Sequence, residues 1–320
     1  MWEYVIPHFK GFHNKLELNE VDHTDALGKA YRVSKCLFRK YYPGFSDDLN
    51  SLLKCVILTG SYGKQTAIRP TSDVDMLFIL PYEKRHQFDA HQGNGQSNLL
   101  YEIRQTLLGT YPQTNISGDG QVVCVNFNSY NFEIAPAFRE SDGSFLICDT
   151  NNGGRWKPTH PQAELNMIQL ADSISSGSAR ALIKYIKGWK RYKGVKIKSI
   201  AIEVIATQFI EQWRHLNDSN TIMSPFWWHD WMVRDFFFYL LNFDRVIIPG
   251  LSEIIPIGEN WTAACIEAYR EAVSACEYEH RDMPINAETH WKKIFGSAFP
   301  SSAPSALSLN LTRQALLGRI

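Results

Sequence analysis

Two aspartates separated by one residue carry the clearest chemical signal in the sequence. Asp73 and Asp75 lie at the start of an apolar run, Val74 to Leu80, that has the length and composition of a β-strand. Because side chains alternate between the two faces of a strand, both carboxylates lie on the same face. Carboxylates that close repel each other unless a cation neutralises them, and their hard oxygen atoms suit Mg²⁺. The pair alone is equally compatible with a solvated strand end.

A turn that can bind phosphate precedes the aspartates. A short apolar run, Lys54 to Thr59, has the properties of a strand and is stopped by Gly60, which Ser61 follows. Glycine permits close approach of the backbone, and the N–H groups of such a turn can bind triphosphate oxygens together with the Ser61 hydroxyl. The G-x-x-x-x-G-K-[ST] pattern of a P-loop is lacking. The turn and the acids at this interval predict transfer of a nucleotide from a nucleoside triphosphate.

A third carboxylate, Glu133, lies between the apolar residues Phe132 and Ile134. A charge at this place either completes a metal site with the aspartates or belongs to an edge strand and faces solvent, and the local sequence leaves both alternatives open. In the first case Asp73, Asp75 and Glu133 hold two Mg²⁺ ions, with Mn²⁺ as a substitute, for phosphoryl transfer.

The elements that must position these residues divide the chain into two parts. The first part combines short strands with helices over 24–40 and 97–111, an exposed polar loop over 83–97, and a hairpin of 121–127 with 132–135. From about Pro161 the pattern predicts successive helices over 161–175, 178–193, 199–214, 229–243 and 260–280. Residues 301–320 are rich in Ser, Ala and Pro and are expected to form a flexible tail.

Composition excludes several classes of protein. Lys plus Arg and Asp plus Glu both number 33, so net charge does not indicate a general nucleic-acid binder. No basic, apolar leader and no apolar run of membrane-spanning length is present, which predicts a cytoplasmic protein without a membrane partner. Six scattered cysteines without metal spacing are expected to be reduced thiols rather than disulfides or a zinc site.

The segment GSYGKQTAIRPTSDVDML, residues 60–77, resembles the bacterial cyclic-oligonucleotide synthases known as CD-NTases, which are relatives of cyclic GMP-AMP synthase and the oligoadenylate synthetases. Later segments resemble the family in the same order, namely 133–138, 153–161, 185–190, 198–203 and 290–300. The resemblance implies an α+β, bilobal, polymerase-β-like fold: a catalytic core over 1–160, whose N-terminal helix packs on the other lobe, and a helical lobe over 161–300 like that of the oligoadenylate synthetases.

The resemblance also implies nucleotide-binding residues outside the acidic strand. Lys187 and Ser199 match a lysine and a serine that contact the triphosphate in the family. Lys187 is alternatively a solvated helix lysine, and Lys184 competes for the same role. Ser199 is also expected to cap its helix, which is compatible with phosphate binding.

Residues beside the turn have two interpretations each. Tyr62 packs in the core or shapes the nucleotide pocket, and Lys64, with Arg69, contacts phosphate or belongs to a structural turn. The aromatic run over 226–231 is expected to pack in the core rather than to stack on bases. At the third acidic position many relatives have Asp where this chain has Glu133, which is expected to shift the metal geometry slightly.

By resemblance, the enzyme uses ATP, together with GTP, UTP or CTP, to make a cyclic di- or trinucleotide that acts on a downstream effector in anti-phage defence. A regulatory protein partner is compatible with this role. No segment resembles the zinc insertion with which the animal enzyme binds duplex DNA, so DNA activation is not expected. The alternatives are transfer of a nucleotide to an RNA end, a small molecule or a protein, and a catalytically silent nucleotide-binding scaffold.

Overall fold

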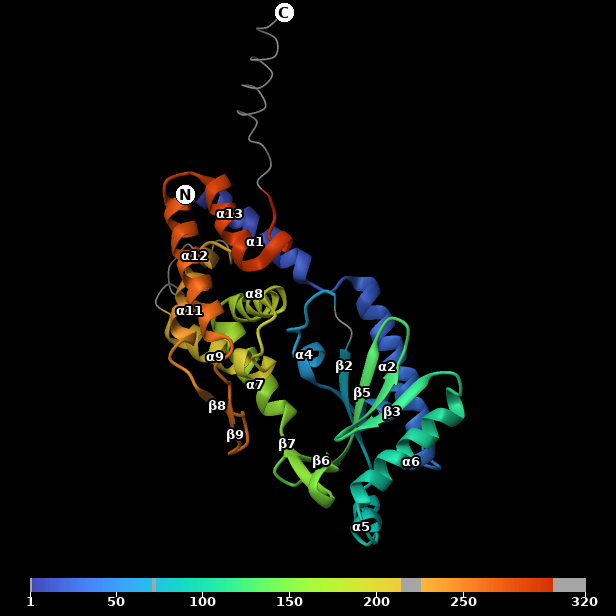
Figure 1. The fold of residues 1–320 in the computed structure, drawn as a ribbon. Helices are drawn as coiled ribbons and strands as arrows, with labels where there is room; N and C mark the ends of the chain where they lie inside the picture. Colours follow the sequence, from blue (N-terminus) through green and yellow to red (C-terminus); the bar gives the residue numbers. More distant parts are fainter. Residues whose placement is uncertain (1, 71–72, 214–225, 302–320) are drawn as a thin grey trace, which may run out of the picture. The chain divides into compact units, whose positions relative to one another are not determined.

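The computed structural model describes residues 2–70, 73–213 and 226–301 (Figure 1). Its contacts divide the chain into two compact units. The sheet unit comprises Glu17–Leu170 and Ile247–Ile255. The helical unit comprises Met1–Leu16, Ala171–Val246 and Pro256–Ile320. The predicted flexible tail lies outside the described residues apart from Ser301.

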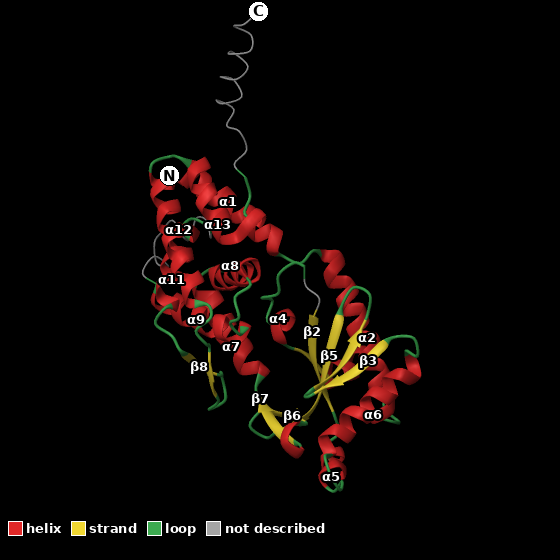
Figure 2. Ribbon diagram, viewed as in Figure 1, coloured by secondary structure: helices red, strands yellow, loops and turns green. Residues whose placement is uncertain are grey.

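The sheet unit is built on a seven-stranded mixed sheet (Figure 2). Its strands are β1 (Val56–Leu58), β2 (Asp73–Ile79), β3 (Asn115–Asp119), β4 (Val122–Asn126), β5 (Asn131–Arg139), β6 (Phe145–Asp149) and β7 (Arg155–Thr159). The main path has the order β1-β2-β5-β4-β3, and β6 pairs with both β5 and β7. The pairing of β2 with β5 is parallel, whereas the other pairings are antiparallel.

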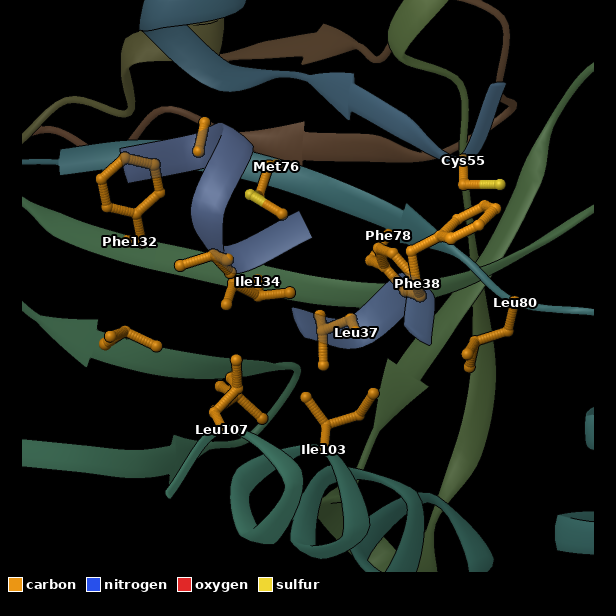
Figure 3. Packing of buried hydrophobic residues seen from close by; sticks show 14 of the residues in the cluster. Leu37, Phe38, Cys55, Met76, Phe78, Leu80, Ile103, Leu107, Phe132 and Ile134 are labelled. Carbon is orange, nitrogen blue, oxygen red and sulfur yellow. The ribbon is translucent and has the colours of Figure 1, made fainter. Parts of the chain in front are cut away.

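Helices cover one face of this sheet. The helices of the unit are α2 (Glu20–Tyr41), α3 (Leu49–Cys55), α4 (Gly60–Gly63), α5 (Glu83–Asp89), α6 (Gly95–Thr110) and α7 (Pro161–Ile174), with a 3₁₀ turn η1 (Asn151–Gly153); α7 continues into the helical unit. Leu37 of α2 and Ile103 of α6 pack with Met76, Phe78 and Ile134 of the sheet in one apolar core (Figure 3). Burial of this apolar surface is the main stabilising contribution.

Strand alternation determines which face of the sheet carries the acids. In β2, Met76 and Phe78 point toward the core beneath α2 and α6, whereas Leu77 belongs to a smaller apolar cluster with Ala135 of β5. Asp73, Asp75 and Glu133 have the same parity as this second set, so they lie on the sheet face opposite α2 and α6.

The predicted elements of the sheet unit are confirmed in part. The hairpin is present, with Asn126 paired to Asn131, and the helices over 24–40 and 97–111 correspond to α2 and α6. The exposed loop over 83–97 is wrong, because 83–89 form α5, which buries Phe88 as an apolar anchor. The first predicted strand is too long, since Lys54 and Cys55 end α3.

The helical unit contains every helix predicted after residue 175. Its elements are α1 (Trp2–Leu16), α8 (Ser178–Lys193), α9 (Ser199–Gln212), α11 (His229–Leu240), β8 (Arg245–Ile247), β9 (Ile254–Pro256), α12 (Thr262–His280), α13 (Pro284–Phe295) and the 3₁₀ turn η3 (Gly296–Ala298). β8 and β9 form a small hairpin, of which Ile247–Ile255 are assigned to the sheet unit. Phe9 and Phe12 of α1 contact Tyr185, Phe295 and Phe299, so aromatic packing joins the amino-terminal helix to the last helices.

Two further expectations can be compared with the structure. In the aromatic run, Trp228 and His229 are buried, which agrees with core packing. All six cysteines are free thiols.

Among the described helices, none has both the length and the apolar character that crossing a membrane requires.

Candidate active site

The parallel pairing of β2 with β5 brings the predicted acids together. Asp75 lies directly opposite Glu133, and Asp73 lies opposite Asn131. The Asn131 side-chain amide donates a hydrogen bond to Asp73 Oδ1 at 3.4 Å. Because β5 lies between β2 and β4, Glu133 is not on an edge strand, and that alternative is wrong.

The electrostatics of Glu133 show how closely the negative charges gather. Partial burial raises the pKa of its carboxyl, and the neighbouring carboxylates of Asp75 and Asp73 raise it further. Like charges in a poorly solvated place disfavour ionisation of one another. The donor set consists of hard carboxylate oxygens, so the site fits Mg²⁺, and a bound divalent cation would relieve this repulsion.

Gly60 places the Gly60-Ser61 turn against the second aspartate. Its φ of +57° lies in the left-handed region, and a Cβ atom at this position would come within 1.8 Å of Asp75 Oδ2. Only glycine meets both requirements. Gly60, Ser61 and Tyr62 begin the one-turn helix α4, and their N–H groups are the donors that have no carbonyl partner within their own helix.

We expect Gly60→Ala to lower the rate of the predicted nucleotidyl transfer by about a hundredfold, because displacing a reacting group by about 1 Å costs this much. The added methyl group would push the Asp75 carboxylate out of place. Gly120→Ala is the matched control: its φ is +55°, yet a Cβ atom there meets nothing within 4 Å. Steady-state rates of both variants test the prediction, and equal losses would contradict it.

Tyr62 and Lys64 make contacts within the sheet unit. The Tyr62 ring is buried, and its hydroxyl lies 3.0 Å from His23 Nδ1 of α2. The buried Lys64 ammonium donates to Glu164 of α7 at 2.6 Å. These contacts support the packing interpretation of Tyr62 and a structural role for Lys64. Direct contact of either residue with nucleotide stays a prediction.

Lys187 and Ser199 both lie in the helical unit, and each has a polar partner there. The Lys187 ammonium forms a buried ion pair with Glu203 at 2.6 Å. Ser199 is the first residue of α9, and the capping position is Lys198, so the expected capping role of Ser199 is wrong.

A lysine that sequence reasoning missed contacts the serine. Lys190 Nζ donates to Ser199 Oγ at 3.2 Å, and burial lowers the pKa of this lysine. Its position three residues after Lys187 on the same helix was the available signal, because residues three apart lie on one helix face.

Nucleotidyltransferases of the polymerase-β-like class have a mixed sheet in which one strand carries two carboxylates, the neighbouring strand carries a third carboxylate, and a Gly-Ser turn precedes the first strand. This chain has the same combination of features. Within this class, the chain belongs to the family of the Second Messenger Oligonucleotide or Dinucleotide Synthetase domain, whose sequence profile matches residues 5–171. It is therefore an enzyme of cyclic nucleotide synthesis.

Comparison with individual proteins agrees with this assignment. The chain is 24% identical to a probable cyclic nucleotide synthase of Bacillus cereus over 291 residues, which cover 78% of this chain and 83% of the relative. It is 22% identical to the cyclic AMP-AMP-AMP synthase of an Acinetobacter strain over 276 residues, which cover 77% and 73%. Among solved structures, Escherichia coli CdnC in its HORMA-deltaN complex has the same fold, with a TM-score of 0.66, 19% identity and coverage of 93% and 99%.

Proposed function

We propose that this chain joins nucleoside triphosphates into a cyclic di- or trinucleotide in a Mg²⁺-dependent reaction, as part of anti-phage signalling in the cytoplasm. The observation that carries the proposal is the register of β2 and β5, which sets Asp75 opposite Glu133 beside the Gly60 turn. The two cyclic nucleotide synthases named above support the class of product.

The reaction is an attack by a ribose 2′- or 3′-hydroxyl of one nucleotide on the α-phosphate of another. The bond from the α-phosphorus to the bridging oxygen breaks, pyrophosphate leaves, and the attacking hydroxyl releases its proton. One further round closes a dinucleotide ring, and two close a trinucleotide ring. Asp73, Asp75 and Glu133 would hold two Mg²⁺ ions. When bound, these ions supply Lewis-acid activation of the hydroxyl and neutralisation of the pyrophosphate charge.

The chain's other residues bind and orient the triphosphate in this proposal. The N–H groups of Gly60 and Ser61 donate to phosphate oxygens, together with the Ser61 hydroxyl. Ser199 contributes a hydroxyl from the start of α9. We assign the accompanying cation to Lys190 rather than Lys187, because Lys190 already contacts Ser199, whereas the Lys187 charge is compensated by Glu203.

The assignment predicts that Lys190→Ala raises the apparent KM for nucleoside triphosphate by roughly tenfold, the loss expected for one hydrogen bond to a charged group. Lys193→Ala is the control on the same helix, because Lys193 pairs with the exposed Glu267. Initial rates over a range of triphosphate concentrations measure the effect. An unchanged KM for Lys190→Ala would contradict the assignment.

The proposed activity is tested with purified chain, Mg²⁺ and mixtures of ATP, GTP, UTP and CTP. We expect pyrophosphate release and, by mass spectrometry, a product that lacks free phosphate ends. A nucleotide attached to RNA, protein or a small molecule would establish the alternative transferase activity. Absence of pyrophosphate release in every mixture, including mixtures with phage-derived activators, would favour the scaffold.

A regulatory partner belongs to the proposal because CdnC has been solved in a complex with a HORMA protein. We expect the present chain to bind a partner of this kind and to deliver its product to a downstream effector. Size-exclusion chromatography with that HORMA protein tests the first expectation. Separate elution at micromolar concentrations would contradict it.

A further inference from the structure

A buried group of potential metal ligands lies in the helical unit, apart from the candidate active-site acids. Asp230 belongs to α11, and Cys276 and Glu279 lie one turn apart on α12. One ligand atom from each residue lies within 4.8 Å of the others. The three residues are only 1%, 6% and 3% exposed, respectively, which is unusual for acidic side chains.

The carboxylate oxygens of this group have few partners. Both oxygens of Asp230 and Oε2 of Glu279 are buried without a hydrogen-bond partner among the described residues. The remaining oxygen, Glu279 Oε1, accepts a hydrogen bond from Trp291 Nε1 of α13 at 2.9 Å. A buried polar group without a partner costs free energy, and a buried charge costs more. The group therefore requires a cation or a proton.

The nearby arginine does not meet this requirement by direct contact. Arg234 lies one turn after Asp230 on α11, but its guanidinium binds the carboxylate of Asp235, with Nε to Oδ1 at 2.8 Å. Burial raises the pKa of both Asp230 and Glu279, and the nearby Asp230 carboxylate raises that of Glu279 further.

We propose that Asp230, Cys276 and Glu279 form a structural site for a divalent cation of borderline softness, Zn²⁺ first, which joins α11 to α12. A thiolate with two carboxylates suits Zn²⁺, whereas Mg²⁺ takes oxygen ligands only. Bonds to Zn²⁺ of about 2.0–2.3 Å place the ligand atoms of one ion within about 4.6 Å of one another, and the observed spacing of up to 4.8 Å is close to this limit. The Trp291 hydrogen bond orients the Glu279 carboxylate, as outer partners of metal ligands do.

The competing explanation is a proton shared between the two carboxyl groups, with Cys276 as a bystander thiol. The two explanations differ in the role of the thiol. Zn²⁺ binding requires the Cys276 sulfur as a thiolate, whereas a shared proton does not involve it.

The test uses full-length protein that has never contacted a metal-affinity resin. An Asp73→Asn/Asp75→Asn background removes most metal binding at the candidate active site. In this background, metal content is measured after dialysis against Zn²⁺, and the thiolate-to-metal charge-transfer absorption is recorded with Co²⁺. Cys276→Ser and Asp230→Asn test the ligands.

Cys265→Ser is the matched control, since Cys265 is a buried thiol of α12 that donates to the Phe237 carbonyl at 3.2 Å. Cys124→Ser is a second control, because Cys124 lies opposite Glu133.

We expect about one Zn²⁺ per chain, with affinity falling at least about tenfold in Cys276→Ser and Asp230→Asn. The Co²⁺ absorption should disappear in Cys276→Ser and persist in both control variants. A chelator should lower the melting temperature of the parent and of Cys265→Ser, but not that of Cys276→Ser. Absence of bound Zn²⁺ in the parent, or Co²⁺ absorption that survives in Cys276→Ser, would overturn the proposal. Because the parent itself supplies metal content and a chelator response, the proposal remains testable even when a variant does not fold.

Discussion

Replacement of both Asp73 and Asp75 by asparagine should reduce formation of the cyclic product by at least about a thousandfold, while the chain remains folded. Asparagine has nearly the same shape as aspartate but no charge, so it should preserve the pairing of β2 with β5. Loss of two of the three carboxylates removes most of the negative charge that would hold the metal ions. The pyrophosphate release rate and the mass of the product measure the effect, and circular dichroism verifies the fold.

The control for the double variant is Asp119→Asn. This nearby carboxylate contributes to the raised pKa of Glu133, but it lies in β3 and is exposed. We expect its replacement to change the rate by less than about threefold, as for a screened surface charge. Comparable losses in the control and the double variant would show that general electrostatics, rather than metal ligation, explains the loss.

Lys187→Ala should lower the free energy of unfolding by about 3–5 kcal/mol, because it leaves the Glu203 carboxylate buried without its cation. Both partners are almost completely buried, with side-chain exposures of 7% and 1%. Urea unfolding followed by tryptophan fluorescence measures the loss. Lys193→Ala, a change in a surface ion pair on the same helix, should cost less than about 1 kcal/mol.

The same experiment decides between the two interpretations of Lys187. If the role is structural, Lys187→Met combined with Glu203→Gln should regain most of the lost stability, because neither buried group then carries a charge. If Lys187 binds the triphosphate instead, Lys187→Ala should weaken nucleotide binding with little loss of stability. That second outcome would contradict our assignment of the phosphate contact to Lys190.

Predictions from periodicity succeeded where burial of a helix face follows directly from the local pattern. The helices α8, α9, α11 and α12 begin within two residues of the predicted positions. The helix α5 was missed because its polar residues resemble a loop and only Phe88 marks its buried face. The strands β3 and β7 were missed because they contain few consecutive apolar residues and depend on their neighbours in the sheet, whereas β6 was missed although Phe145 to Cys148 form a short apolar run.

The candidate site shows the same division. Sequence by itself determined the Gly60-Ser61 turn and the shared face of Asp73 and Asp75, because glycine conformation and strand alternation act between chain neighbours. The tertiary structure decided that Glu133 faces Asp75, since this depends on the register of two strands far apart in the chain.

Partner choice among buried charges was decided by the tertiary structure alone. The packing of the helices pairs Lys187 with Glu203 and places Lys190 within hydrogen-bond distance of Ser199. The same packing brings the unpaired carboxylate of Asp230 next to Glu279. Local sequence determines which face of a helix is buried, but the helix that packs against that face determines whether a buried charge meets an opposite charge, a hydroxyl or another carboxylate.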